Sequence, residues 1–390
     1  MADPCQVVYN LPAASLESPA DDARTYSDDN GYCQIGDSGI FMLDHSMLYF
    51  GVSLAILSGL MNGTFTLPMR YLGRWSWENV WALFIVVACL IMPPIIMLVT
   101  VTRPWQVLAI APARAEIIAL STGFIWGFGA VLFGLGVSAI GISMANTLVL
   151  ATSASLGSLL PMLILAPERV GQPQGRAIML GTATAIAGMS LCGYAGVLRE
   201  RSEPASPGAS RQMVGEARPF WAGLLICTGA GVISALFNVG YSLSQGIIAA
   251  AVRAGNTPFA GSNLIWFLVL GAGAIANLAY CGYLFRKNHS WPKYAQSQGA
   301  ALFALAILMG LLWGGSIFVY GGAAPRLGKL GPAIGWPLSL VVSLVTANLC
   351  GFLSGEWKLS SAGARRWMFS GLGVLLLAIG ILGWSGRLAG

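Results

Sequence analysis

The chain has 390 residues, of which 56% are hydrophobic and only 9% are charged. Soluble domains carry about 25% charged residues, so this composition cannot give a folded chain a hydrated surface. It excludes a soluble globular protein and predicts an all-α polytopic membrane protein. The net charge of +6 is modest and indicates loop topology rather than nucleic-acid binding.

Residues 1–45 form an acidic segment without an apolar run of signal-peptide length. Eight acidic residues face one base, Arg24, so we expect a retained, flexible tail. Cys5 and Cys33 lie in this tail and could pair if it is extracytoplasmic, whereas the other five cysteines lie in apolar runs. No cysteine spacing resembles a metal site, so we expect neither a metal nor a cofactor.

A helix needs about 20 apolar residues to span a bilayer, and ten segments of the chain meet this length. A very short turn around Ser138 joins the third to the fourth, and a turn over 325–328 joins the eighth to the ninth. The polar linker 199–218 separates two five-helix repeats, 46–198 and 219–390. The predicted spanning helices are 47–68, 77–99, 116–137, 140–165, 177–197, 219–240, 263–285, 299–321, 331–354 and 367–385.

A pattern of glycine and aromatic residues in the third helix returns in the eighth, 187 positions later. A second match, at an offset of 172, relates the first helix to the sixth. Because five is odd, a duplicated five-helix unit re-enters the membrane with opposite polarity, which predicts an inverted-topology repeat. The matched residues are Gly123, Trp126, Gly127, Phe133, Gly134 and Gly141 with Gly310, Trp313, Gly314, Tyr320, Gly321 and Gly328, and Gly51, Gly59 and Phe65 with Gly223, Gly231 and Phe237.

The distribution of basic residues predicts the orientation. Loops after odd-numbered helices hold twelve Lys and Arg residues, and loops after even-numbered helices hold seven. The excess places the odd loops in the cytoplasm, and both termini would then be extracytoplasmic.

No HExxH, GxSxG or P-loop pattern occurs in the chain, so we do not expect an enzyme or an ATP-driven pump. The absence favours secondary transport or facilitated diffusion. We expect a central cavity bounded by helices 1, 3 and 4 and their counterparts 6, 8 and 9.

Uncharged polar and aromatic residues inside the helices are the candidate binding residues. Asn62, Asn238 and Asn348 carry amides that suit the hydroxyls of an uncharged sugar, although amides also form hydrogen bonds between membrane helices. Trp126 and Trp313 lie inside their helices rather than in the interfacial belt where tryptophan collects. With Tyr320 they could stack on the C–H face of a sugar, or they could only fill space between helices.

The acidic residues beyond the tail avoid the centres of the helices. A proton relay usually needs an ionisable group within the membrane, and no carboxylate lies at a helix centre. Glu78, Glu116 and Glu356 lie at helix ends, where ion pairs are expected. Glu78 and Glu356 are also the candidates for proton coupling.

The start of the second helix carries a motif of basic, aromatic and acidic residues. It reads Arg74, Trp75, Ser76, Trp77 and Glu78, and Glu356-Trp357 follows at the end of the ninth helix. These motifs, the Gly-x-x-Trp-Gly stretches and the ten-helix length resemble the L-rhamnose/proton symporter family of the drug/metabolite transporter superfamily. The resemblance covers residues 47–387.

The resemblance implies uptake of L-rhamnose or a similar deoxy-sugar by proton symport, through alternating access, across the bacterial inner membrane. The partners would then be a small sugar, a proton and the lipid bilayer, with no nucleic acid. Two alternatives with the same fold are a drug/metabolite exporter and an uncoupled sugar facilitator. A membrane sensor or scaffold without flux is the alternative from another class.

Overall fold

The computed structural model describes residues 45–140, 142–202, 220–296 and 300–388, and every regular element in these ranges is a helix. Ten helical stretches in these ranges are long and apolar enough to cross a membrane, by length and composition. This confirms the all-helical class and the number of spanning helices. The tail with Cys5 and Cys33, and residues 203–219 of the linker region, lie outside the described residues.

The helices before the linker form the first five spanning stretches. They are α1 (His45–Thr64) with η1 (Leu67–Tyr71), then α2 (Trp77–Ile85), η2 (Val86–Ile91) and α3 (Met92–Thr100), then α4 (Pro104–Ile110), α5 (Ala113–Trp126) and α6 (Gly129–Ile140), then α7 (Ile142–Leu165) with η3 (Pro167–Arg169), and α8 (Pro173–Ser202).

The helices after the linker form the other five. They are α9 (Phe220–Leu243) with α10 (Gln245–Arg253), α11 (Pro258–Asn288) with α12 (Lys293–Gln296), α13 (Ala300–Arg326), α14 (Gly331–Leu353), and α15 (Ala362–Ser385) with η4 (Gly386–Leu388).

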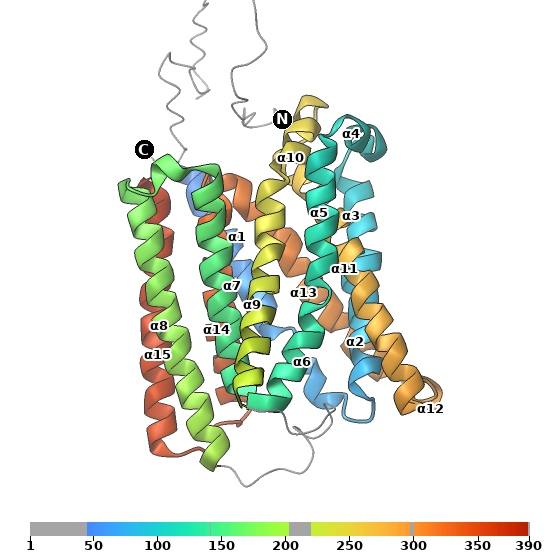
Figure 1. Ribbon diagram of the computed structural model, residues 1–390, viewed down its shortest axis with the longest axis vertical. Helices are drawn as coiled ribbons and strands as arrows, with labels where there is room; N and C mark the ends of the chain where they lie inside the picture. Colours follow the sequence, from blue (N-terminus) through green and yellow to red (C-terminus); the bar gives the residue numbers. More distant parts are fainter. Residues whose placement is uncertain (1–44, 141, 203–219, 297–299, 389–390) are drawn as a thin grey trace, which may run out of the picture.

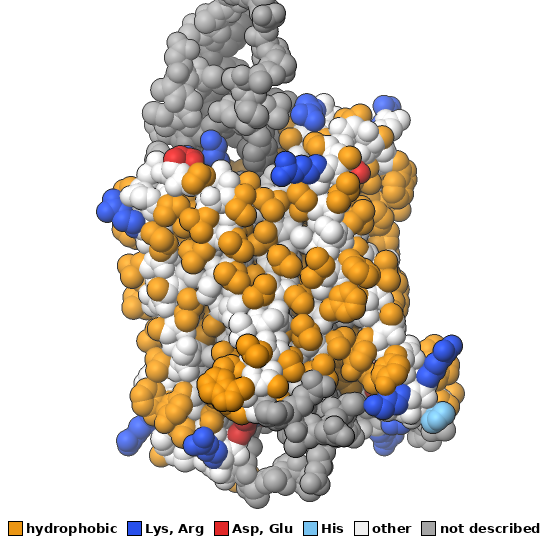
Figure 2. Space-filling view, in the orientation of Figure 1, with side chains coloured by type: hydrophobic (Ala, Val, Ile, Leu, Met, Phe, Trp, Pro, Cys, Tyr) orange, Lys and Arg blue, Asp and Glu red, His pale blue; other side chains and the backbone are white. Residues whose placement is uncertain are grey.

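The spanning helices stand side by side in one bundle (Figure 1). α1 begins and α15 ends at the same end, where the guanidinium of Arg387 donates to the hydroxyl of Tyr49 at 2.5 Å. This is termed the terminal end. α8 ends and α9 begins at the opposite end, termed the linker end (Figure 1). Figure 2 shows hydrophobic side chains over the middle of the bundle and most Lys and Arg side chains near its two ends, as expected for a protein surrounded by lipid.

Two spanning stretches are interrupted near their middles. η2 is a turn of π-helix that precedes Pro93 and Pro94, whose missing N–H groups interrupt α-helical hydrogen bonding. The third stretch, predicted as one helix over 116–137, breaks between α5 and α6 at Gly127 and Phe128. α6 then continues to Ile140, past the position predicted for the turn around Ser138. α8 continues to Ser202, so the start of the predicted linker 199–218 is helical.

The glycines matched between α1 and α9 lie at close helix contacts. A Cβ atom on Gly59 would lie 2.5 Å from the Cβ of Val342 on α14, and one on Gly231 would lie 2.6 Å from the Cβ of Thr152 on α7. Small residues allow such approach between membrane helices. α1 therefore packs on α13 and α14, and α9 packs on α5, α6 and α7.

The glycines beside the two matched tryptophans also lie at helix contacts. A Cβ atom on Gly123 would lie 2.2 Å from the carbonyl oxygen of Val269 on α11, and one on Gly310 would lie 2.7 Å from the Cβ of Val87 in η2. α5 thus packs on α11, while α13 packs on α2 and η2. These contacts fix the two helices that carry Trp126 and Trp313.

Candidate functional site

Trp126 and Trp313 meet inside the bundle. Their rings are nearly parallel, with centroids 5.5 Å apart and an interplanar angle of 9°. Both side chains are half-buried. Two residues that the sequence places 187 positions apart therefore form one stacked pair, and this pair joins α5 to α13.

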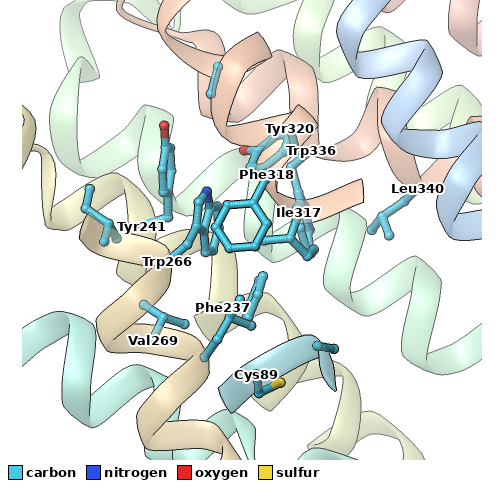
Figure 3. Close-up of a cluster of buried hydrophobic side chains, with 14 of the residues drawn as sticks. Cys89, Phe237, Tyr241, Trp266, Val269, Ile317, Phe318, Tyr320, Trp336 and Leu340 are labelled. Carbon is cyan, nitrogen blue, oxygen red and sulfur yellow. The ribbon is translucent and has the colours of Figure 1, made fainter. Parts of the chain in front are cut away.

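Phe237 of α9 packs against several other rings, which together are termed the aromatic core. Figure 3 labels five rings of this core, those of Phe237, Tyr241, Trp266, Tyr320 and Trp336. The ring centroid of Phe237 lies 4.8 Å from that of Trp126, 5.0 Å from that of Trp266 and 5.8 Å from that of Trp336. No charged side chain belongs to the core. Its members are Trp126, Phe237, Tyr241, Trp266, Trp313, Tyr320 and Trp336.

Sequence reasoning missed Tyr241, Trp266 and Trp336 as members of this core. Trp266 and Trp336 are buried, with 0% and 8% of their surfaces exposed. Both lie within spanning helices, away from the interfacial belt, which is the signal that identified Trp126 and Trp313. They have no aromatic counterpart at the matched repeat positions, so the repeat did not point to them.

Tyr320 and Asn238 are joined in a buried network that uses the whole amide group of Asn238. The hydroxyl of Tyr320 donates to the Asn238 Oδ1. The Asn238 Nδ2 donates to the carbonyl oxygens of Gly157 at 2.7 Å and Pro332 at 3.1 Å. In this conformation Asn238 holds α9 to α7, α13 and α14, so contact with a ligand hydroxyl requires the network to open.

Asn62 and Asn348 lie apart from this network, at the linker-end portions of α1 and α14. Both are half-buried, and Nδ2 of Asn348 donates to the carbonyl oxygen of Leu344 in its own helix at 2.8 Å. Gly63 packs on Thr346, which puts Asn62 and Asn348 at one level of the α1–α14 contact. The structure therefore separates the three predicted asparagines.

Glu78 is buried within a polar group at the linker end, termed the Glu78 cluster. Its side chain is 3% exposed, and its Oε1 accepts hydrogen bonds from Asn288 Nδ2 at 3.0 Å and from the Ser290 hydroxyl. Among the described side chains these neutral donors stand in place of the expected ion pair. The start of α2 favours a carboxylate because the helix dipole is positive there. The cluster consists of Ser76, Glu78, Asn79, Asn288, Ser290, Lys293 and Tyr294.

Further hydrogen bonds hold α2 to the segment after α11. The ammonium of Lys293 donates to the Ser76 hydroxyl at 2.6 Å, and Nδ2 of Asn79 donates to the Ser290 carbonyl at 3.1 Å. The Tyr294 hydroxyl donates to the Asn79 carbonyl at 2.7 Å. Burial raises the pKa of Tyr294 to about 12, so this donor keeps its proton at neutral pH.

The motif from Arg74 to Glu78 forms the entry to α2. Arg74 is exposed, whereas Trp75 is buried with its ring edge-on to Tyr294 at 5.1 Å. Trp77 stacks on Trp81 with the ring centroids 5.1 Å apart. The motif therefore supplies the packing that buries Glu78.

Glu356 lies in a different environment at the same end of the bundle. Its side chain is 39% exposed and lies 3.7 Å from the guanidinium of Arg199, an ion pair of the kind expected at helix ends. Arg199 also covers the ring of Trp357 at 5.1 Å. The pair ties the end of α8 to the segment between α14 and α15.

An apolar groove of about 390 Å³ lies between α5, α6 and α11, outside the aromatic core. Its walls offer few groups that could bind hydroxyls. They are formed by Phe124, Phe128, Val131, Ile275, Ala276, Ala279 and Tyr280. In the described ranges no group of three His, Cys, Asp or Glu residues could hold a metal ion.

Comparison with known proteins gives one consistent family. The family model of the L-rhamnose-proton symport protein matches residues 45–387. L-rhamnose-proton symporters of Yersinia pestis and Yersinia pseudotuberculosis are each 24% identical over 347 residues, covering 87% of this chain and 98% of theirs. A crystal structure of a protein with 14% identity aligns with a TM-score of 0.50 over 87% of this chain and 96% of its own, a likeness of fold alone.

Proposed function

The chain belongs to the L-rhamnose-proton symport protein family, and on this basis we propose that it is a secondary transporter of L-rhamnose or a similar deoxy-sugar, driven by proton symport. The family match over residues 45–387 carries the proposal, since it spans all ten apolar helices. The relatives that match along almost their whole length are L-rhamnose-proton symporters.

The uncharged aromatic core is the proposed sugar site. Aromatic faces suit the C–H face of a neutral sugar, while a charged substrate would need a counter-charge that the core lacks. Trp126, Trp313 and Tyr320 form its proposed wall. Trp126 and Trp313 stack on each other in this conformation. When α5 and α13 move apart, the sugar would stack on one of the two rings in place of the other ring.

Asn238, Asn62 and Asn348 are the proposed hydroxyl contacts. Asn238 is adjacent to the wall through Tyr320, and its amide becomes available when the Tyr320 bond opens. Asn62 and Asn348 lie near the linker end of the contact between α1 and α14. They would contact the sugar as it moves between the aromatic core and the linker end.

Two five-helix repeats of opposite polarity, in the manner of drug/metabolite transporters, form the proposed architecture. The helix packing supports it: α1 contacts α13 and α14, and its counterpart α9 contacts α5, α6 and α7. The matched glycines Gly59 and Gly231 lie at corresponding contacts. Alternating access then arises because each half can adopt the arrangement of the other around one site.

Glu78 is the proposed proton-coupling residue, in preference to Glu356. Among the residues that the structure describes, Glu78 is the one buried carboxylate, and its partners are neutral. A carboxylate with neutral partners can gain or lose a proton without breaking an ion pair. Glu356 is exposed and already paired with Arg199.

The proposed location is the bacterial inner membrane, with the linker end in the cytoplasm. The excess of basic residues in the odd-numbered loops supports this orientation. Both termini would then be extracytoplasmic.

The test is uptake of labelled L-rhamnose into proteoliposomes, with and without an imposed inward proton gradient. We expect saturable uptake, and accumulation above the external concentration only when the gradient is present. Saturable uptake that ignores the gradient identifies an uncoupled facilitator instead. Absence of saturable uptake for L-rhamnose and related deoxy-sugars contradicts the substrate assignment and favours an exporter or a protein without flux.

A further inference from the structure

The indole N–H of Trp266 is a buried donor without a partner. Trp266 is 0% exposed, and its Nε1 forms no hydrogen bond with any described residue. Buried donors are almost always paired, because an unpaired one loses its bond to water and gains nothing in return. In Trp336, by contrast, Nε1 donates to the Ser153 carbonyl at 3.3 Å.

The surroundings of Trp266 explain why the N–H stays unpaired. Its ring lies 4.7 Å from that of Tyr241 and 6.0 Å from that of Tyr320. The Tyr241 hydroxyl pairs with the Ser262 hydroxyl at 2.8 Å, and the Tyr320 hydroxyl donates to Asn238. Both neighbouring hydroxyls are therefore engaged elsewhere.

Gly321 of α13 faces the nitrogen-bearing edge of the indole ring. A Cβ atom at this position would lie 2.5 Å from the Trp266 Nε1, so any side chain would cover the donor. Figure 3 shows this nitrogen on the edge of the ring that faces away from Phe237 and Val269. Gly321 lies on α13, the helix that also carries Trp313 and Tyr320.

A second unpaired polar group borders the aromatic core on the other half of the chain. The Ser153 hydroxyl on α7 is 0% exposed and has no partner among the described residues, although a helical serine usually bonds to the carbonyl four residues earlier. Its backbone carbonyl accepts from Trp336, a member of the core. Unsatisfied polar groups thus lie beside the proposed sugar site in both halves.

We infer that Trp266 is a specificity-determining residue whose indole N–H donates a hydrogen bond to a hydroxyl of the transported sugar. The inference rests on the proposed function. A polyhydroxylated substrate supplies the acceptor that the protein lacks, and displacement of α13 from α11 uncovers the donor. A site built around a hydroxyl rejects analogues without it, because the protein donor is then left unpaired.

The experiment compares sugars that differ by one hydroxyl. Wild-type protein and Trp266→Phe are reconstituted, and each monodeoxy analogue of L-rhamnose competes against labelled L-rhamnose uptake. The selectivity ratio is the affinity for L-rhamnose divided by the affinity for the analogue. For the one analogue that lacks the bonded hydroxyl, we expect a ratio of about ten in wild-type protein, which corresponds to the free energy of one hydrogen bond. In Trp266→Phe the ratio for this analogue should fall to about one, because the donor is absent.

Trp75→Phe is the matched control. Trp75 is 4% exposed, and its Nε1 also lacks a partner in the described part of the chain, but it lies beside the Glu78 cluster. The same substitution there should leave the sugar selectivity ratio at its wild-type value, whatever it does to the rate. Loss of the ratio in both variants would contradict a specific role for Trp266.

Gly321→Ala provides a second route that keeps the indole ring. Its methyl group would cover the Nε1 edge, so the same selectivity ratio should fall. If Trp266→Phe elutes as an aggregate in detergent, Gly321→Ala decides the question. If folded Trp266→Phe or Gly321→Ala keeps the selectivity ratio of the wild-type protein, the inference is overturned and the proposed function stands. If vesicles with wild-type protein take up no sugar, the inference and the proposed function are overturned together.

Discussion

The aromatic core and the Glu78 cluster each hold fully buried side chains, but the chemistry of these side chains is opposite. The core consists of packed aromatic rings without a charged group, and one of them, Tyr320, donates to the Asn238 amide. The cluster, at the linker end of the bundle, holds the Glu78 carboxylate with neutral donors from Asn288 and Ser290, and the Lys293 ammonium bonded to Ser76. In the proposed function the core recognises the neutral sugar and the cluster handles the proton, and α11 contributes a residue to each, Trp266 and Asn288.

A chain of aromatic rings connects the two regions. Trp77 stacks on Trp81, the Trp81 ring lies 4.8 Å from Phe84, and Phe84 lies 5.5 Å from Trp313. Trp77 directly precedes Glu78, and Trp313 belongs to the proposed sugar wall. A change at the carboxylate that moves the start of α2 therefore reaches the wall through packed side chains.

The largest expected effect follows from removing the negative charge of Glu78. Glu78→Gln keeps the size of the side chain but cannot exchange a proton. Accumulation of L-rhamnose driven by a proton gradient should be lost, while exchange of labelled for unlabelled sugar continues, because the aromatic core is unchanged. Proteoliposome uptake and counterflow measure the two processes, and accumulation at the wild-type level would remove Glu78 from coupling.

A second prediction removes rings from the core. Trp126→Ala and Trp313→Ala should each raise the KM for L-rhamnose about tenfold, since each deletes one face of the stacked pair. Gradient-driven accumulation should persist at saturating sugar. Trp105→Ala is the control, because Trp105 is 61% exposed on the outside of the bundle and its loss should leave KM unchanged.

The sequence predicted the spanning helices and part of the aromatic core, because different physical signals encode them. Apolar run length depends only on local residues, so all ten spanning stretches could be placed. The repeated glycine and aromatic pattern adds a long-range signal, which singled out Trp126 and Trp313 from the sequence. Trp266 and Trp336 carry no such signal, because their approach to Phe237 depends on how helices far apart in sequence pack.

The environments of Glu78 and Glu356 could not be predicted from the sequence either. Both lie at helix ends next to tryptophan, so sequence position alone gave them the same expected role. Burial of Glu78 depends on Trp75 packing on Tyr294, more than 200 residues away in the chain. Occupation of the Asn238 amide by two backbone carbonyls likewise depends on tertiary contacts that no side-chain pattern encodes.

A smaller effect is expected from removing the hydrogen bond between Tyr320 of α13 and Asn238 of α9. Tyr320→Phe keeps the ring but leaves the Asn238 Oδ1 unpaired in a buried site, which should lower stability by about 1 kcal/mol. Thermal unfolding in detergent should show a lower Tm, with Tyr283→Phe as the control, since Tyr283 is 57% exposed. An unchanged Tm would mean that another group satisfies Asn238.

The smallest expected effect separates the two glutamates. Glu356→Gln breaks a 3.7 Å ion pair that solvent already screens, so stability should change by less than about 1 kcal/mol. Accumulation under a proton gradient should stay at the wild-type level, in contrast to Glu78→Gln, because the charge lost was paired with Arg199. The opposite result, with accumulation lost in Glu356→Gln and kept in Glu78→Gln, would contradict the choice of the buried carboxylate. Proton coupling would then be assigned to the exposed Arg199–Glu356 pair at the end of α8.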